Sequence, residues 1–315
     1  MSAAAEIVIV GSHCPGIFLR VKRPPLPGET VIGWDYQEPV DGGKGSNQAI
    51  AAARLGGRVS FVGCVGRDAV GDSGERWMKL AGVDTTYLYK SETTGSGVGF
   101  ILLDEAGVPA MVSSLGANAE LTAAQVDAAL DGLPVAKFLL TQLEIPAEVA
   151  LHALRAAKAR GLTTIFNPAP APDAPAVQDT AWGRLDFVDI LVPNESEARL
   201  LLGLPPADQT PLPEIAARLR EELGVGAALI TAGEQGFFGC DALGEWSEAP
   251  PPVQVVDTSG AGDMFCAALA VALAEGLPIC RASRRANALA ALSVTHAGTI
   301  PSYPTLAEAE AFLAT

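Results

Sequence analysis

The sequence has little cysteine and little positive charge, and both shortages argue against whole classes of function. Its five cysteines are an odd number, lie scattered along the chain and form no CxxC pair. This usage argues against a disulfide framework and a zinc site, and it indicates reduced thiols. Lys and Arg number 21 against 36 Asp and Glu, a formal net charge of −15. We therefore expect neither nucleic acid nor a membrane as partner, although backbone N–H groups can still hold a phosphate locally.

The sequence also lacks a recognisable targeting or membrane-spanning segment. The first residues, MSAAAEIVIVG, have no basic region, and their apolar run is too short for a signal peptide or a membrane span. The Ala-rich run at 261–275 contains Asp263 and Glu275, which favours a buried helix. We expect a cytoplasmic protein.

Apolar residues, in contrast, are plentiful: 49% of the 315 residues are hydrophobic and 18% are charged. Such a chain forms one large α/β domain or two ordinary ones. Short β-type runs lie at 7–10, 59–63, 138–141, 163–166, 189–192 and 227–231, and helix-like segments lie at 44–56, 70–81, 146–160, 195–203 and 212–223. This alternation predicts an α/β fold with a doubly wound, mostly parallel central sheet flanked by helices. We expect a single domain over residues 1–315.

Two segments break the alternation of strands and helices. Residues 17–41 and 95–114 alternate apolar with polar residues around Gly and Pro turns, which predicts antiparallel strands. Both segments follow strands of the parallel sheet. We therefore favour a small antiparallel β lid formed by about 13–41 and 95–114, with two ordinary surface hairpins as a nearly equal alternative.

The strongest chemical signal is DTSGAGD at 257–263. The small residues Gly260, Ala261 and Gly262 stand where a turn becomes a helix, so successive N–H groups can point at one anion. Asp263 would lie beside that anion, where a carboxylate can accept a proton from an attacking hydroxyl. A well-capped helix start explains the same residues about equally well.

A second motif, GGKGSN at 42–47, runs into a helical pattern. Paired glycines let a polar ligand approach the backbone closely, and Asn47 can donate to and accept from hydroxyls. The motif is neither a P-loop nor the dinucleotide fingerprint GxGxxG. A plain strand-to-helix turn is the alternative.

Two further motifs follow predicted strands. In PNESE at 193–197, Asn194 and Glu197 share one helix face and could order water around a magnesium ion. A capping box is the favoured local reading of this pair, and it is compatible with the metal role. The small-residue loop TAGEQG at 231–236 could cover a nucleotide phosphate or ribose.

Together these motifs resemble the signatures of the PfkB, or ribokinase-like, family of carbohydrate kinases, and the ribokinase branch most of all. GGKGSNQAIAAARLGG resembles the N-terminal signature and DTSGAGDMFCAALAVAL the C-terminal one, while NPAP, NESE, TAGEQG and THAGTIPS follow in the family's order and spacing. The resemblance covers essentially the whole chain. It implies an ATP-dependent transfer of the γ-phosphoryl group to a hydroxymethyl group of a small carbohydrate or polyol.

The resemblance also implies a role for each motif. Asp263 would be the catalytic base, and Gly260, Ala261 and Gly262 the anion hole. Positions matched to sugar contacts are Gly43, Lys44, Asn47, Glu144 and Asp263. Positions matched to nucleotide contacts are Asn194, Thr231, Gly233, Gly236, Gly262 and Asn287. Glu197 matches a magnesium-water motif, and a monovalent-cation loop is matched by Asp257, Ser259, Val294, Ala297, Gly298 and Ser302. The implied cofactors are ATP, Mg²⁺ and K⁺, and the implied assembly is a homodimer through the lid.

Two positions depart from the family pattern. The ribokinase branch carries GSxNxD after its first strand, whereas this chain has Cys14 and Gly16 in place of the Asn and Asp. The identity of the acceptor is therefore open, because a site built for hydroxyls discriminates through such pairings. His13 and Asp41 are candidate replacements. A histidine at a strand end is more often structural, and Asp41 can equally face solvent.

Two other functions remain open. A nucleoside kinase of the same family agrees with Trp34 and with the loss of the ribose-gripping pair. A ligand-binding member without turnover would keep the fold, but it has no chemical need for Asp263, the anion hole and the NxxE motif together.

Overall fold

The computed structural model describes residues 6–37, 42–171, 183–205 and 207–314 of the 315-residue chain. Its main feature is a nine-stranded sheet in the order β13-β12-β11-β10-β9-β8-β1-β4-β5. The strands are β1 (Ile7–Val10), β4 (Val59–Gly66), β5 (Asp84–Ser91), β8 (Phe138–Thr141), β9 (Thr163–Phe166), β10 (Ile190–Leu191), β11 (Ala227–Thr231), β12 (Phe237–Asp241) and β13 (Gly244–Glu248). All neighbours from β5 to β11 pair in parallel, and only the β11–β12–β13 edge is antiparallel. The predicted mostly parallel sheet is confirmed.

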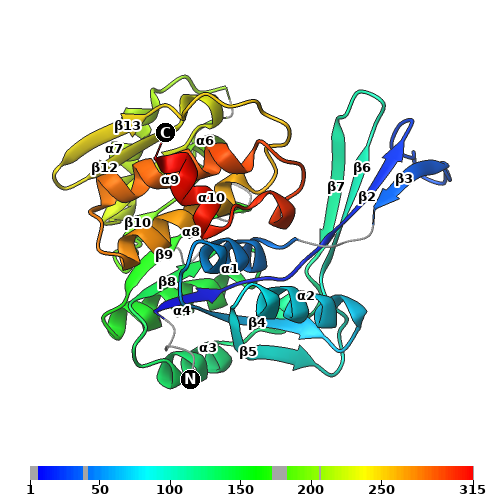
Figure 1. Cartoon of the computed structure of the whole chain (residues 1–315), viewed down its shortest axis with the longest axis horizontal. Helices are drawn as coiled ribbons and strands as arrows, with labels where there is room; N and C mark the ends of the chain where they lie inside the picture. Colours follow the sequence, from blue (N-terminus) through cyan, green and yellow to red (C-terminus); the bar gives the residue numbers. More distant parts are fainter. Residues whose placement is uncertain (1–5, 38–41, 172–182, 206, 315) are drawn as a thin grey trace.

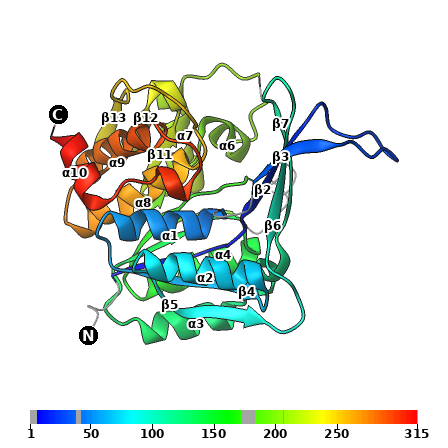
Figure 2. The same cartoon turned by 45° about the vertical axis from the view of Figure 1, so that its right-hand side comes forward.

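Helices cover both faces of this sheet (Figures 1 and 2). Each face has its own apolar core. One face carries α1 (Lys44–Arg54), α2 (Ala69–Leu80), α8 (Ala261–Ala274), α9 (Ile279–Ser293) and α10 (Leu306–Leu313). The other carries α3 (Ala123–Gly132), α4 (Ala147–Ala159), α6 (Glu195–Leu201) and α7 (Leu212–Leu223). Single turns of 3₁₀-helix are η1 (Gly116–Glu120), η2 (Gly233–Gln235) and η3 (Ile300–Ser302).

The Ala-rich segment forms α8, which is buried continuously from Asp263 to Ala272. Its small side chains let α1 and α9 pack closely against it, so the motif that opens α8 lies within the body of the protein. The predicted buried helix is therefore confirmed. Among the described helices, none is long and apolar enough to cross a membrane.

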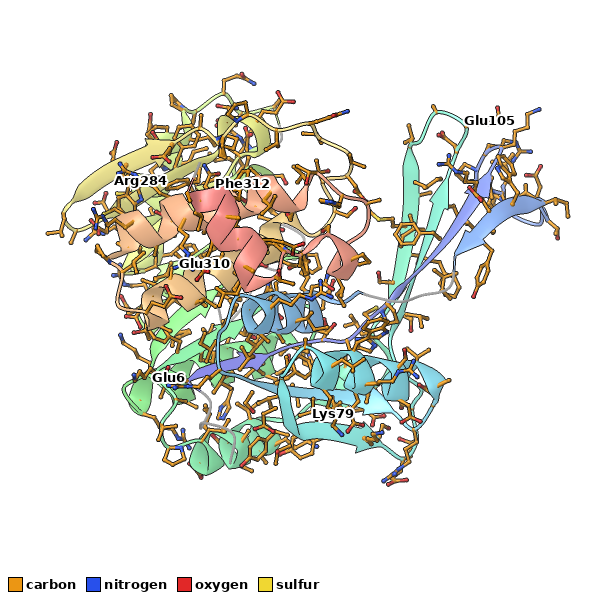
Figure 3. The ribbon with its side chains drawn as sticks, viewed as in Figure 1. Glu6, Lys79, Glu105, Arg284, Glu310 and Phe312 are labelled. Carbon is orange, nitrogen blue, oxygen red and sulfur yellow. The ribbon has the colours of Figure 1, made fainter. Side chains whose placement is uncertain are left out.

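A second, four-stranded sheet, called the lid below, projects from the body of the protein (Figure 1). Its strands are β2 (Gly16–Val21), β3 (Gly33–Gln37), β6 (Val98–Leu103) and β7 (Pro109–Ser114), in the order β3-β2-β6-β7. Glu105, labelled in Figure 3, marks the far end of the β6–β7 hairpin. Each hairpin is antiparallel as predicted, whereas β2 and β6, which join the two hairpins, pair in parallel. The reason is that both strands continue from parallel strands, β1 and β5, and leave the main sheet in the same direction.

Candidate active site

The two glycine-containing motifs, far apart in sequence, meet at the start of α1 and α8. Asn47 Nδ2 donates to Asp263 Oδ2 at 3.0 Å, and Gln48 Nε2 donates to Asp263 Oδ1 at 3.0 Å. Asp263 is 5% exposed. The carboxylate is thus held by two amides from the first turns of α1, and Gln48 is a site residue that the motif comparison did not include.

The turn before α8 contains the residues predicted to hold an anion. Gly260 is the N-cap with a left-handed φ of 73°, and no side chain caps the helix, so the helix-cap interpretation of this motif does not hold. A Cβ on Gly260 would lie 2.4 Å from Tyr303 Oη, whereas a Cβ on Gly262 would meet no atom within 4 Å. The space in front of Gly262 is therefore open, at the positive end of a 14-residue helix. A phosphoryl group fits that space chemically.

Glu144 and Lys44 lie close to the Asp263 carboxylate. Glu144 Oε2 accepts hydrogen bonds from Ser12 Oγ at 2.6 Å and from the Lys44 backbone N–H at 2.8 Å. Burial alone would lower the pKa of the Lys44 ammonium, but the negative charges of Asp263, Glu144 and Glu197 outweigh it and raise the pKa. Lys44 is therefore a permanently charged group among three carboxylates.

Gly43 shows why the paired glycines are needed. Its φ is 85°, and a Cβ there would lie 2.4 Å from the Cys14 backbone nitrogen. The turn before α1 thus lies directly against the segment after β1, and any side chain at position 43 would push the two apart.

His13 and Asp41 were the candidates to replace the Asn and Asp that this chain lacks at positions 14 and 16, and the structure describes only His13. The His13 ring is buried, its Nδ1 lies 3.1 Å from Ser46 Oγ, and a Cβ on Gly74 would meet its Nε2 at 2.3 Å. Asn118 holds the His13 backbone through bonds of 2.9 and 2.8 Å. This packing favours the structural interpretation of His13. Asp41 lies outside the described residues.

A cavity of about 710 Å³ lies against the start of α8. Its lining contains every residue predicted to contact a nucleotide: Asn194, Thr231, Gly233, Gly236, Gly262 and Asn287. A short parallel bridge joins Asn194 to Thr231, and Asn287 Nδ2 donates to the Glu248 carbonyl at 3.2 Å. The segment 250–255 supplies an apolar wall that the sequence interpretation missed. The sequence PPPVQV at 250–255 could have indicated this wall, because consecutive prolines fix an extended backbone.

The NxxE motif forms the predicted capping box. Asn194 Oδ1 accepts from the Glu197 N–H at 2.8 Å, and Glu197 Oε2 accepts from the Asn194 N–H at 2.8 Å. Burial raises the pKa of Glu197, and Asp263 adds to the rise, while the Asn194 N–H and Lys44 oppose it. Within the described ranges, no three His, Cys, Asp or Glu side chains gather as a ready metal cage. These donors suit a magnesium ion held by nucleotide phosphates and water.

The segment predicted to bind a monovalent cation folds as one cluster. Asp257 accepts from the Ser259 and Gly298 N–H groups, each at 2.9 Å. Burial would raise the pKa of Asp257, but these donors lower it, so the carboxylate stays ionised. The Val294 carbonyl accepts from the Val256 and Asp257 N–H groups at 2.8 and 3.2 Å. The Ser302 hydroxyl donates to the Thr299 carbonyl at 2.7 Å, and Ala297 directly precedes Gly298.

Comparisons with known proteins agree on one family. The model for the pfkB family carbohydrate kinases matches residues 5–306. The chain is 38% identical over 308 residues to a ribokinase of Bacillus subtilis (strain 168), covering 98% of this chain and 99% of the relative. It is 32% identical over 308 residues to a deoxyribokinase of Salmonella typhimurium (strain LT2), covering 98% of each. The structure of Arabidopsis thaliana ribokinase with ribose and ATP matches with a TM-score of 0.88 at 31% identity, covering 99% of this chain and 100% of that chain.

Proposed function

Since this chain belongs to the pfkB family of carbohydrate kinases, phosphotransferases whose acceptor is an alcohol group, we propose that it transfers the γ-phosphoryl group of ATP to a hydroxymethyl group of a small sugar. The observation that carries the proposal is the position of Asp263. This buried carboxylate lies one residue from the open cradle at Gly262, which lines the same 710 Å³ cavity as every predicted nucleotide contact. We assign the whole chain to one kinase domain with a lid.

In this proposal Asp263 takes the proton of the acceptor hydroxyl. The acceptor oxygen forms a bond to the γ-phosphorus as the bond from phosphorus to the β–γ bridging oxygen breaks, and ADP leaves with that electron pair. The N–H groups at the start of α8 and the Lys44 ammonium stabilise the negative charge of the transferring group. Lys44 suits this role because it lines the nucleotide cavity and also faces Glu144.

Bound magnesium would neutralise phosphate charge and help align the nucleotide. Glu197 is the residue we propose to hold it through water. For Asn194, whose side chain caps α6 and lines the nucleotide cavity, we propose contact with the nucleotide phosphates. The lid would exclude water, which otherwise competes with the sugar as acceptor.

The residues proposed to contact the acceptor include a polar group around Glu144. Glu144 is positioned by Ser12 and by the Lys44 backbone, and Asn47 donates to Asp263. Cys14 and Gly16 offer less to a hydroxyl. Burial and then the charge of Glu144 raise the pKa of Cys14 to about 12, so its thiol stays neutral and is a weak donor. A Cβ on Gly16 would lie 2.6 Å from Ile101 Cδ1. We therefore propose an acceptor that presents fewer hydroxyls toward Cys14 and Gly16 than toward Glu144.

Three further properties belong to the proposal. K⁺ would bind at the cluster around Asp257, where an ionised carboxylate faces the turn into α8. Phe100 and Val112 are paired across β6 and β7 on one face of the lid and are exposed, so we propose a homodimer through this sheet. All five cysteines are free, which agrees with a reducing, cytoplasmic compartment.

The test is an ADP-release assay with Mg-ATP, with and without K⁺, over pentoses, deoxypentoses, ketohexoses, tetroses, sugar acids and nucleosides. We expect acceptor-dependent ADP from a small sugar and stimulation by K⁺. Turnover of nucleosides alone would favour the nucleoside kinase. No acceptor-dependent ADP from any member of the panel would refute the kinase proposal and favour a binding protein.

A further inference from the structure

The most connected side chain beside the proposed base is an amide that the proposed reaction does not use. Gln48, one residue after Asn47 in α1, is fully buried. We propose that Gln48 is the positioning residue of the catalytic carboxylate: it holds Asp263 Oδ1 from inside the fold, so that Oδ2 is the oxygen that receives the acceptor proton. This inference rests on the proposed role of Asp263 as the base.

The hydrogen bonds of Gln48 give it a single orientation. Its Nε2 donates to Asp263 Oδ1 at 3.0 Å and to Asn167 Oδ1 at 3.2 Å, and its Oε1 accepts from Gln142 Nε2. Both N–H donors and the carbonyl are therefore engaged. Because the oxygen accepts while the nitrogen donates, the amide cannot flip without losing all three bonds.

The partners of Gln48 are anchored to the ends of neighbouring central strands. Gln142 directly follows β8 and is itself fully buried. Asn167 directly follows β9, and its Nδ2 donates to the Val192 carbonyl, just after β10, at 2.8 Å. The Asp263 carboxylate is thus held in place by residues at the ends of three strands, not by a loop. Support from rigid elements of this kind keeps a reacting group in its working position.

The two amides on Asp263 differ in what they can do during a reaction cycle. Asn47 is also within 3.5 Å of Thr299 Oγ1 and is predicted to contact the acceptor, so its bonds can be exchanged when the acceptor binds. Gln48 has no exposed surface and reaches Asp263 from the side of the strand ends. It acts through the carboxylate and does not touch the substrate.

The hydrogen bonds from Gln142 to Gln48 and from Gln48 to Asp263 also run in one direction, toward the carboxylate. Gln142 donates to Gln48, which in turn donates to the carboxylate, and donors linked in series reinforce one another in a medium of low dielectric constant. Gln48 is therefore expected to keep the Asp263 carboxylate in one orientation throughout the reaction cycle.

The test compares Gln48→Leu and Gln48→Glu with the wild type in kcat and in KM for ATP and for the acceptor. Loss of a hydrogen bond to a charged group predicts a fall in kcat of about 10- to 100-fold for Gln48→Leu, with both KM values changed by less than about 3-fold. Gln48→Glu keeps the size of the side chain but places a carboxylate oxygen where the amide donated to Asp263 Oδ1, so kcat should fall by at least as much.

Thr164→Val is the matched control. Thr164 is fully buried in the same sheet, and its hydroxyl donates to the Phe187 carbonyl at 2.7 Å, away from Asp263. We expect it to lower Tm with kcat unchanged. If Gln48→Leu does not fold, the isosteric Gln48→Glu decides the question on its kcat and KM values.

An unchanged kcat in the Gln48 variants, with Asp263→Asn inactive, would overturn the positioning role while leaving the kinase proposal intact. A lower Tm with an unchanged kcat, as expected for Thr164→Val, would equally overturn it. Full turnover by Asp263→Asn would instead refute the proposed base, on which this inference depends.

Discussion

Replacing Gly262 by alanine tests whether the glycines at the start of α8 serve catalysis or only the fold. Gly262 lies in the first turn of the helix, and an added Cβ would meet no protein atom within 4 Å. Alanine is a better helix residue than glycine by about 0.5–1 kcal/mol. On structural grounds alone, Gly262→Ala should be neutral or slightly more stable, with Tm raised by about 1–3 °C for a chain of this size.

The same methyl group would stand inside the proposed phosphoryl cradle. Alanine keeps its backbone N–H, but the methyl group would hold the phosphoryl group away from that donor. Loss of one donor contact in an oxyanion-type site costs about 10²–10³-fold in kcat, so we expect a loss of this order together with an unchanged or raised Tm. The measurements are ADP release at saturating substrates and thermal unfolding without nucleotide.

Gly260→Ala is the matched comparison. Its φ of 73° and the 2.4 Å approach of the added Cβ to Tyr303 Oη predict a lower Tm. Wild-type turnover by a stable Gly262→Ala enzyme would refute the assignment of the cradle.

Three other outcomes follow from the site and the lid. Asp263→Asn should lower kcat by at least about 10²-fold with the Kd for ATP retained, measured by turnover and calorimetry; near-normal turnover would contradict the role of the base. Glu197→Gln should weaken Mg²⁺ activation yet raise Tm near neutral pH. The folded-state pKa of Glu197 is raised above its ordinary value of 4.5, so the native protein loses stability as pH rises through that window, and the amide removes this cost. A Tm difference of the same size at pH 4 would argue against this cause. Val112→Glu should convert a dimer to monomers in sedimentation experiments, and an unchanged mass would place the interface elsewhere.

Parts of the fold were predictable because they depend on local patterns. The strands β8, β9 and β11 lie at the residues that their apolar runs predicted, since a strand buried on both faces must be apolar throughout. β5 was not predicted. It is an edge strand with the mixed sequence DTTYLYKS, and only its pairing with β4 makes it a strand.

The lid shows the same division between local and tertiary information. Turn residues predicted its two hairpins, but nothing within either segment indicates that β2 and β6 pair in parallel. That pairing depends on the directions in which β1 and β5 leave the main sheet.

The sequence by itself determined which reacting groups this protein has and where helices such as α1, α6, α7 and α8 begin, whereas α3, α9 and α10 were not predicted. A glycine at position 260 permits the left-handed turn before α8, and an aspartate three residues later falls in the first helical turn. Only the tertiary structure decided that Asn47 and Gln48 hold that aspartate, because their contact depends on how α1 and α8 pack on one face of the sheet. The charge of Lys44 among three carboxylates and the proline wall of the nucleotide cavity are likewise tertiary facts. These features form where the ends of separate strands lie close together in the fold, and no local sequence pattern indicates which ends will do so.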